Sequence, residues 1–199
     1  AGPGSKPFWS AGAFPPGVPD RQWPHLQFFF TPMMFRDDPA EGRKYAIPGF
    51  QIDVNVMRPE SRGTLRLRSA DPREHPLLDP NYLSEESDCR QMVEGIELAR
   101  EIAGRTPLAG YSAGEVSPGA QWKSRSGILE GLRNCLISGY HPAGTCRMGV
   151  DGDSMAVLDA RMRVRGLEGL RVVDASAMPC LTTGNTNAPI VMMAEKAAD

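Results

Sequence analysis

Hydrophobic and polar residues alternate in two segments of the first half of the chain. Residues 51–57 put Ile52, Val54 and Val56 on one face and polar side chains on the other, the period of two that is typical of half-buried strands. Residues 64–68 alternate in the same way, and the turn-forming residues 58–63 lie between the two segments. We therefore expect 51–57 and 64–68 to be antiparallel neighbours in a sheet with one solvated face.

A continuous apolar run precedes these segments. Residues 26–35 are rich in phenylalanine, which favours strands, and Pro32 interrupts the run because proline cannot donate a ladder hydrogen bond. The run therefore predicts a buried strand that breaks at Pro32. A shorter run at residues 170–174 predicts another buried strand close to the C-terminus.

Three segments have the period of an α-helix. The strongest is 84–103, which ends before Gly104, at the position of a C-terminal cap, and has one apolar stripe: Met92, Ile96, Ala99 and Ala103. Residues 128–137 give a weaker pattern. The third helix is expected at 188–198, with Asn187 as its N-cap and Pro189 in the first turn, where the missing N–H is tolerated.

These elements predict an α+β fold, in which helices 84–103 and 128–137 cover one side of an antiparallel sheet of several strands. The 199 residues are 41% hydrophobic and carry a net charge of −2, which argues against disorder and against a nucleic-acid partner. No apolar run approaches the roughly 20 residues that span a bilayer, and the N-terminus lacks a signal peptide's features, so we expect a cytoplasmic protein. Four scattered cysteines without a C-x-x-C pair favour reduced thiols.

Two motifs have the residue types of a reactive site in unsuitable surroundings. Residues 110–114 match the G-x-S-x-G elbow of serine hydrolases, but the pattern predicts no strand before Ser112, and its triad partners would have to be Glu130 and His141. Cys135, His141 and Cys146 are soft metal ligands, yet their spacing is wider than that of known zinc sites and a fourth ligand is missing. A plain loop and ordinary buried thiols are the favoured interpretations, and a serine hydrolase using Ser112 stays an alternative.

A third motif, residues 140–149, is better suited to chemistry. A lone histidine is commonly structural, but His141 lies in a loop that Pro142 stiffens and that Gly144 and Gly149 free, as when a side chain is aimed at a pocket. A neutral imidazole is well matched to removing a proton near neutral pH. This context favours a catalytic His141.

The polar turn at 181–189 leads into the last helix. Unpaired N–H groups at a helix N-terminus stabilise negative charge, so Asn185 and Asn187 are placed to hold a polar ring or an anion there. Asn187 is equally well explained as a capping residue. Asn185 is not needed for the cap, which favours a functional role.

Three blocks in this order, residues 141–149, 171–179 and 184–189, resemble the C-terminal third of the glucose–methanol–choline (GMC) oxidoreductases, and most of all their choline-dehydrogenase-like branch. Residues 61–72 and 79–83 add further matches, so that the resemblance covers nearly the whole chain. It implies oxidation of a primary or secondary alcohol to a carbonyl with FAD. By the same resemblance His141 is the base that takes the alcohol proton, and Asn185 hydrogen-bonds the substrate oxygen. The FAD would be contacted by Asp174 and Ala175 and, at the pyrimidine edge of the flavin, by Asn187, Ala188 and Pro189.

One departure from the family matters. Its members begin with a Rossmann-type half that carries G-x-G-x-x-G, and that motif does not occur in this sequence. We therefore expect a C-terminal fragment, with a substrate-binding domain at 1–139 and a catalytic segment at 140–199 that returns to a missing N-terminal FAD-binding part. Alone it is expected to bind little FAD and to be inactive. A non-catalytic binding module remains the other alternative.

Overall fold

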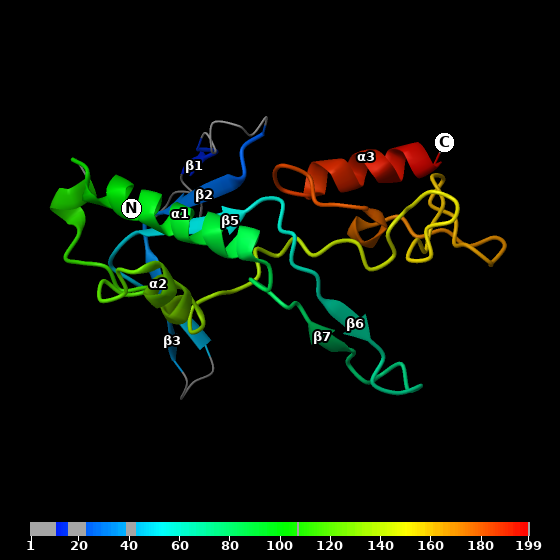
Figure 1. The fold of residues 1–199 in the computed structure, drawn as a ribbon, viewed down its shortest axis with the longest axis horizontal. Helices are drawn as coiled ribbons and strands as arrows, with labels where there is room; N and C mark the ends of the chain where they lie inside the picture. The colour runs from blue at the N-terminus through cyan, green and yellow to red at the C-terminus, as the bar shows by residue number, and fades with distance from the viewer. Residues whose placement is uncertain (1–10, 16–22, 39–42, 107, 199) are drawn as a thin grey trace. The chain divides into compact units, whose positions relative to one another are not determined.

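The computed structural model describes residues 11–15, 23–38, 43–106 and 108–198. Their Cα atoms group into two compact units, the first drawn from Ala1–Val56 and Cys89–Leu136 and the second from Met57–Asp88 and Ile137–Asp199. Small antiparallel sheets and three α-helices make up the structure, which confirms the predicted α+β class (Figure 1). The division at residues 139 and 140, expected on functional grounds, stays a prediction.

The first unit is built on a three-stranded antiparallel sheet of order β1-β2-β5. Its strands are β1 (Ala11–Ala13), β2 (Leu26–Thr31) and β5 (Gln51–Val56). The break at Pro32 is confirmed, because the apolar run divides there into β2 and β3 (Met34–Asp38). Strand β3 pairs with β4 (Arg43–Ile47) in a separate two-stranded sheet.

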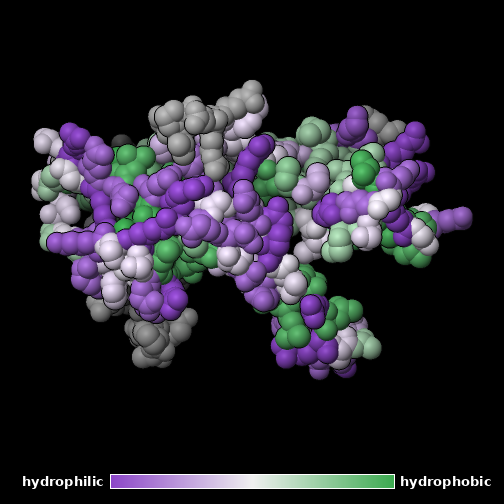
Figure 2. Space-filling model, in the orientation of Figure 1, coloured by the Kyte–Doolittle hydropathy of each residue, from purple (hydrophilic) through white to green (hydrophobic). Residues whose placement is uncertain are grey.

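The predicted pairing of 51–57 with 64–68 is wrong. Strand β5 pairs along its whole length with β2, so that Phe28 faces Val54. Strand β6 (Thr64–Arg66) pairs instead with β7 (Leu77–Asp79) in the second unit. Two alternating segments joined by a turn resemble a hairpin in sequence, but the phenylalanine-rich β2 gives β5 a better hydrophobic partner than β6 does. The β6–β7 hairpin keeps leucines exposed, among them Leu65 and Leu78. Figure 2 shows hydrophobic residues at the surface of the part of the molecule that this hairpin forms.

Helix α1 (Glu86–Gly104) packs closely on the sheet. At Gly95 an added Cβ would lie 2.4 Å from Val54 Cγ1 and 3.3 Å from Leu26 Cδ2, so the helix approaches as closely as only glycine permits. The predicted helix 84–103 is confirmed apart from its ends, although Gly104 is its last residue rather than the residue after it. Asp88 and Gln91 are buried beside Met92, which hydropathy alone does not suggest.

Helix α2 (Arg125–Leu132) starts earlier and ends earlier than the expected 128–137. Ser124 is its N-cap, since the Ser124 hydroxyl accepts the Gly127 N–H at 3.1 Å. The buried Ile128 and Leu132 are one turn apart and form the packed face. The expected helix is therefore present with shifted bounds, and its N-cap at Ser124 was not predicted.

The second unit contains little regular structure apart from the β6–β7 hairpin and α3 (Asn187–Ala198). Its core centres on Leu158, Met162 and Ala177, and α3 contributes Met193 and Ala197 to it. The strand predicted at 170–174 is wrong: only a single bridge, Arg163 to Arg171, forms there. Val172 packs on the core while its N–H bonds to the Met162 carbonyl, so the segment pairs with a loop and not with another strand.

Candidate functional site

His141 lies half-buried in the second unit and is hydrogen-bonded to a residue far along the chain. Its Nδ1 is 3.0 Å from the hydroxyl Oγ1 of Thr186, 45 residues later in the sequence. Thr186 is 4% exposed, so this contact is shielded from water. The loop at 140–149 and the turn before α3 are thereby joined at the histidine through Thr186.

The backbone on either side of His141 is held in unusual conformations. Tyr140 has φ +62°, a left-handed value that is uncommon for a residue other than glycine. Gly144 has φ +88°, which explains the glycine there. Gly149 is needed for another reason: an added Cβ would lie 2.6 Å from the Ala156 Cβ. The two predicted glycines therefore shape the loop, one through backbone freedom and one through close packing.

Three backbone hydrogen bonds join the His141 loop (residues 140–149) to residues 175–177. The donors are the N–H groups of Gly144, Cys146 and Met148, and the acceptors are the carbonyls of Ala175, Ser176 and Ala177, at distances of 3.2, 2.9 and 2.9 Å. The donors are alternate residues of the loop, whereas the acceptors are three successive carbonyls, so the contact is not a strand ladder. Ala175, which was expected to contact FAD, is therefore fixed against the loop that carries His141, and Asp174 directly precedes it.

Asp174 itself has a local structural role. Its carboxylate accepts the Ser176 N–H at 2.8 Å and caps the short 3₁₀ helix η3 (Ala175–Ala177). The carbonyl of Ala175 accepts from Gly144, whereas the Ala175 N–H has no acceptor among the described residues. A backbone donor is thus left open at the place where the family resemblance puts the cofactor.

Arg147 closes the other end of the loop. Its guanidinium makes a bidentate ion pair with Asp153, with Nη1–Oδ2 at 2.8 Å and Nη2–Oδ1 at 3.0 Å. A hydrogen bond from the Met155 N–H and, to a lesser degree, one from the Arg147 guanidinium lower the pKa of Asp153. The Arg147 carbonyl accepts the N–H groups of Val157 and Leu158, at 3.1 and 3.2 Å. Arg147 therefore anchors the loop on the buried Leu158.

The predicted residues before α3 lie at the surface. Asn185, Asn187 and Ala188 are exposed, and Pro189 is half-buried. The first turn of α3 holds no acidic side chain, so its positive end is not neutralised from within the helix. The structure thus brings Thr186, the neighbour of Asn185, onto His141, while Asn185 is itself exposed.

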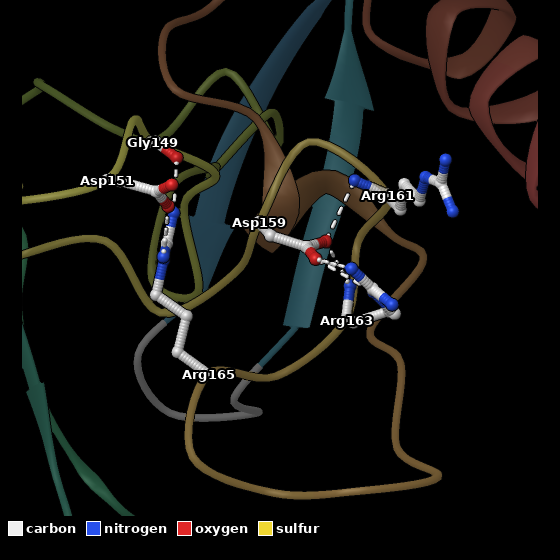
Figure 3. A network of polar contacts seen from close by, with 6 residues as sticks. All are labelled: Gly149, Asp151, Asp159, Arg161, Arg163 and Arg165. Atoms are coloured by element: carbon white, nitrogen blue, oxygen red, sulfur yellow. Dashed lines mark hydrogen bonds and ion pairs between the residues drawn. The ribbon is translucent and has the colours of Figure 1, made fainter.

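Arginine–aspartate pairs fix the chain beyond the loop (Figure 3). Arg165 bonds to the Asp151 carboxylate and to the Gly149 carbonyl, both at 2.8 Å. The Arg163 N–H and guanidinium lower the pKa of Asp159 to about 2. An open groove of about 1570 Å³ runs beside these residues, lined by residues 148–151, 159–161, 163–171 and Pro179. Neither His141 nor Asn185 lines it, so the groove is separate from the predicted site.

The two rival motifs gain no support. Ser112 follows the 3₁₀ turn η2 (Leu108–Tyr111) rather than a strand, and its hydroxyl accepts the Gly114 N–H at 3.3 Å. Glu130 pairs with Arg133. The described residues include no group of three or more His, Cys, Asp or Glu side chains placed to hold a metal. Cys135 and Cys146 are half-buried, free thiols.

Thr186 is the one residue at the site that the sequence interpretation missed. Asn187 was expected to be the N-cap of the last helix, but the Thr186 carbonyl accepts the Ile190 N–H at 3.0 Å, which makes Thr186 the cap. Threonine is itself a preferred N-cap residue, so Thr186, directly before Asn187, was an available signal for the cap. None of the helices in the described ranges is both long and apolar enough to cross a membrane.

Known proteins resemble this chain in sequence. The model of the GMC oxidoreductase C-terminal family matches residues 59–194. The oxygen-dependent choline dehydrogenase of Paraburkholderia phymatum is 44% identical over 198 residues, which is 100% of this chain and 34% of that protein. A protein of Pseudomonas putida named alcohol dehydrogenase [acceptor] is 43% identical over 190 residues, 95% of this chain and 34% of that protein. The chain thus spans about a third of the length of the curated relatives it matches.

Solved structures resemble it in fold. Pyridoxine 4-oxidase from Mesorbium loti superposes with a TM-score of 0.74 at 32% identity, covering 88% of this chain and 34% of the oxidase. A fungal aryl-alcohol oxidase superposes with a TM-score of 0.66 at 27% identity, covering 88% of this chain and 27% of the oxidase. The arrangement of strands and helices described above is therefore shared with larger oxidoreductases.

Proposed function

The chain belongs to the GMC oxidoreductase family, and from this premise we propose that it supplies the catalytic base and the substrate contacts of an FAD-dependent alcohol oxidoreductase. The carrying observation is the geometry of His141. Its Nδ1 is held by Thr186, while no hydrogen bond or ion pair of its other ring nitrogen, Nε2, is found among the described residues. A histidine that is anchored at one nitrogen and open at the other is suited to general-base catalysis.

His141 would accept the proton of the alcohol hydroxyl at Nε2. Asn185, one residue from the Thr186 anchor, would donate a hydrogen bond from its amide to the substrate oxygen as negative charge develops there. The Asn185 side chain is exposed, and this chain covers about a third of the length of its relatives. Both facts are compatible with this role. The paired action of His141 and Asn185 rests on the family resemblance and on their shared attachment to the turn before α3.

The residues present fit a flavin. The first turn of α3 offers the exposed Asn187 and Ala188 at a helix N-terminus without acidic side chains, which suits an electron-rich ring edge. The unpaired Ala175 N–H offers a further donor beside the His141 loop. When bound, FAD would supply the hydride acceptor for the carbon that loses its hydrogen. Pro189 and Asp174 would shape the backbone around these donors.

The proposed substrate is a small primary or secondary alcohol of the choline type, and the proposed partner is an N-terminal FAD-binding part of the same protein. The relatives named for choline and alcohol oxidation support the substrate class. The absence of G-x-G-x-x-G from this sequence supports the partner, because that motif carries the pyrophosphate of a dinucleotide. The chain purified alone is accordingly expected to bind little FAD, which an absorbance spectrum of the dialysed sample would check.

The test of this function is His141→Ala in the flavin-loaded enzyme that contains the chain. Loss of the base should lower turnover about 10²–10⁴-fold while flavin absorbance stays nearly unchanged. His75→Ala, at an exposed histidine of the same unit, is the matched control and should keep full turnover. A His141→Ala enzyme with most of its turnover would remove His141 from the mechanism.

A further inference from the structure

We propose that Thr186 is a positioning residue, which fixes the tautomer and the ring direction of His141 for proton acceptance. This inference rests on the proposed role of His141 as the base. Its observation is the 3.0 Å contact between Thr186 Oγ1 and His141 Nδ1, made by a side chain that is 4% exposed. Because Thr186 holds Nδ1, the nitrogen of His141 that is left to accept a proton is Nε2.

The hydroxyl of Thr186 is not used as a cap hydroxyl normally is. An N-cap side chain usually accepts an N–H from the second or third residue of the helix, as Ser124 does from Gly127 at the start of α2. In α3 the third residue is Pro189, which has no N–H to donate. Among the described residues, the hydrogen bond of the Thr186 hydroxyl is the one with His141.

The Thr186 main chain is fixed independently of that hydroxyl. Its carbonyl accepts the Ile190 N–H at 3.0 Å and so begins the hydrogen-bonding of α3. Met193 and Ala197, further along the helix, pack on the core around Leu158. The same core carries Met148 at the end of the His141 loop. The histidine and its threonine are therefore attached to one packed body, which keeps their distance constant.

The chemistry follows from the two forms of a neutral imidazole. When Nδ1 carries the proton and donates it to Thr186 Oγ1, Nε2 keeps its lone pair and can take a proton. After His141 takes that proton, Nδ1–H still donates to the same hydroxyl, so the ring keeps its direction throughout. With the proton on Nε2 instead, the Thr186 hydroxyl would donate to Nδ1 and the ring would be no base at the substrate side, so the tautomer of the wild-type enzyme decides the proposal.

The experiment compares Thr186→Val with Thr186→Ser in the flavin-loaded enzyme. Valine keeps the shape and removes the hydroxyl, so turnover (kcat) should fall about tenfold with little change in KM, the scale expected for one lost hydrogen bond to a ring nitrogen. Serine keeps the hydroxyl and should restore most of the turnover. A role in folding alone would not produce this pattern of rescue.

A second readout observes the tautomer directly. The enzyme labelled with ¹⁵N at histidine should show neutral His141 with its proton on Nδ1, the signal being assigned by its loss in His141→Ala. Thr186→Val should mix the two tautomers, and Thr186→Ser should not. Thr186→Ala serves as the second hydroxyl-free variant if the valine enzyme fails to fold, because alanine adds no bulk.

The outcomes separate the two proposals. If His141→Ala keeps its turnover, the proposed function fails, whatever Thr186 does. If His141→Ala is impaired but the hydroxyl-free variants keep both wild-type kcat and the Nδ1–H tautomer, the positioning role alone is overturned. A wild-type enzyme whose neutral His141 carries its proton on Nε2 would also overturn it.

Discussion

The two units reach their folds by different means. In the first, β2 and β5 pair over six consecutive positions, and α1 packs on them through Gly95. In the second, most of the chain is irregular, and its shape depends on backbone bonds between loops and on arginine–aspartate pairs such as Arg147–Asp153. The predicted catalytic residues, His141 and Asn185, both belong to the second unit.

This difference has a physical reason. A strand or a helix repeats one conformation, so it can bury a stripe of side chains but cannot aim one residue independently of its neighbours. An irregular chain can aim single residues, provided that its backbone groups are bonded elsewhere. In the second unit they are bonded by the contacts of 144–148 with 175–177, and Tyr140 accepts a left-handed backbone next to His141.

The largest difference in turnover between substitutions in the two units is expected at Asn185. Asn185→Ala should lower turnover of the flavin-loaded enzyme about 10²–10³-fold, as when a donor to a developing oxyanion is lost. Its unfolding midpoint should barely change, since the side chain is exposed. Asn185→His should retain more activity because histidine can donate from a similar place. Asn134→Ala, at an exposed asparagine of the first unit, is the control.

If Asn185→Ala proves to be as active as the control, the second unit would hold one catalytic residue instead of two. The contrast with the first unit would then rest on His141 alone. Steady-state kinetics of both variants with the same alcohol decide between these cases.

The second unit should lose stability when a single buried carboxylate, that of Asp88, is removed. Asp88 is 1% exposed, and its two oxygens accept the N–H groups of Glu60 and Ser61 at 2.9 and 2.8 Å. Asp88→Ala should therefore destabilise the chain by about 3 kcal/mol, the loss expected for hydrogen bonds to a charged group. Urea unfolding measures this difference.

Asp88→Asn should fall between wild type and alanine, because its amide oxygen still accepts one N–H. An Asp88→Ala chain as stable as wild type would mean that the loop at 60–61 does not depend on the carboxylate.

The first unit should instead respond to added volume. Gly95→Ala places a methyl group 2.4 Å from Val54 Cγ1, so crowding should outweigh the helix propensity of alanine and cost about 1–2 kcal/mol net. Adding Val54→Ala should relieve the crowding, which a double-mutant cycle would show as a favourable coupling. Gly104→Ala, at a helix position with no neighbour within 4 Å, should not destabilise the chain. Absence of coupling between positions 95 and 54 would contradict the close approach.

The smallest effect is expected from acid. The Arg163 N–H and guanidinium hold the pKa of Asp159 at about 2, below its ordinary 3.8. A carboxylate with a depressed pKa in the folded state contributes stability above its unfolded pKa and loses it as the pH falls towards 2. Asp159→Asn should therefore be slightly less stable than wild type at about pH 6 and equal to it near pH 2. A difference that persists at the acid end would assign the effect to something other than this charge.

Periodicity predicted the first unit better than the second. The apolar run of β2, its end at Pro32 and the helix α1 follow from residue patterns, because each buries one face of a repeating conformation. The pairing of β5 did not follow, since a pattern identifies a strand but not its partner. The burial of Gln91 on α1 was also hidden, because burial of polar groups depends on partners supplied by other segments.

The site in the second unit was predicted by motif instead. The positions of His141, Asp174 and Asn185 follow from the family resemblance, and the structure adds that the first two are joined by backbone bonds through Gly144 and Ala175. The contact of Thr186 with His141 could not be predicted from pattern alone, because it joins residues 45 positions apart and depends on α3 starting one position earlier than expected. The strand expected at 170–174 does not form, because its valines pack on the core while the segment makes only a single bridge, at Arg171.

The bonds between 144–148 and 175–177 also set how this protein can change over time. Donors at every second residue must meet three successive carbonyls, so one inserted or deleted residue within 144–148 would put at least one of the three bonds out of register. The tip at 150–152 and the turn at 166–169 take no part in this pairing, and both are exposed. Length variation among descendants of this chain should therefore collect at those two turns, while the segment between His141 and Gly149 keeps a constant number of residues.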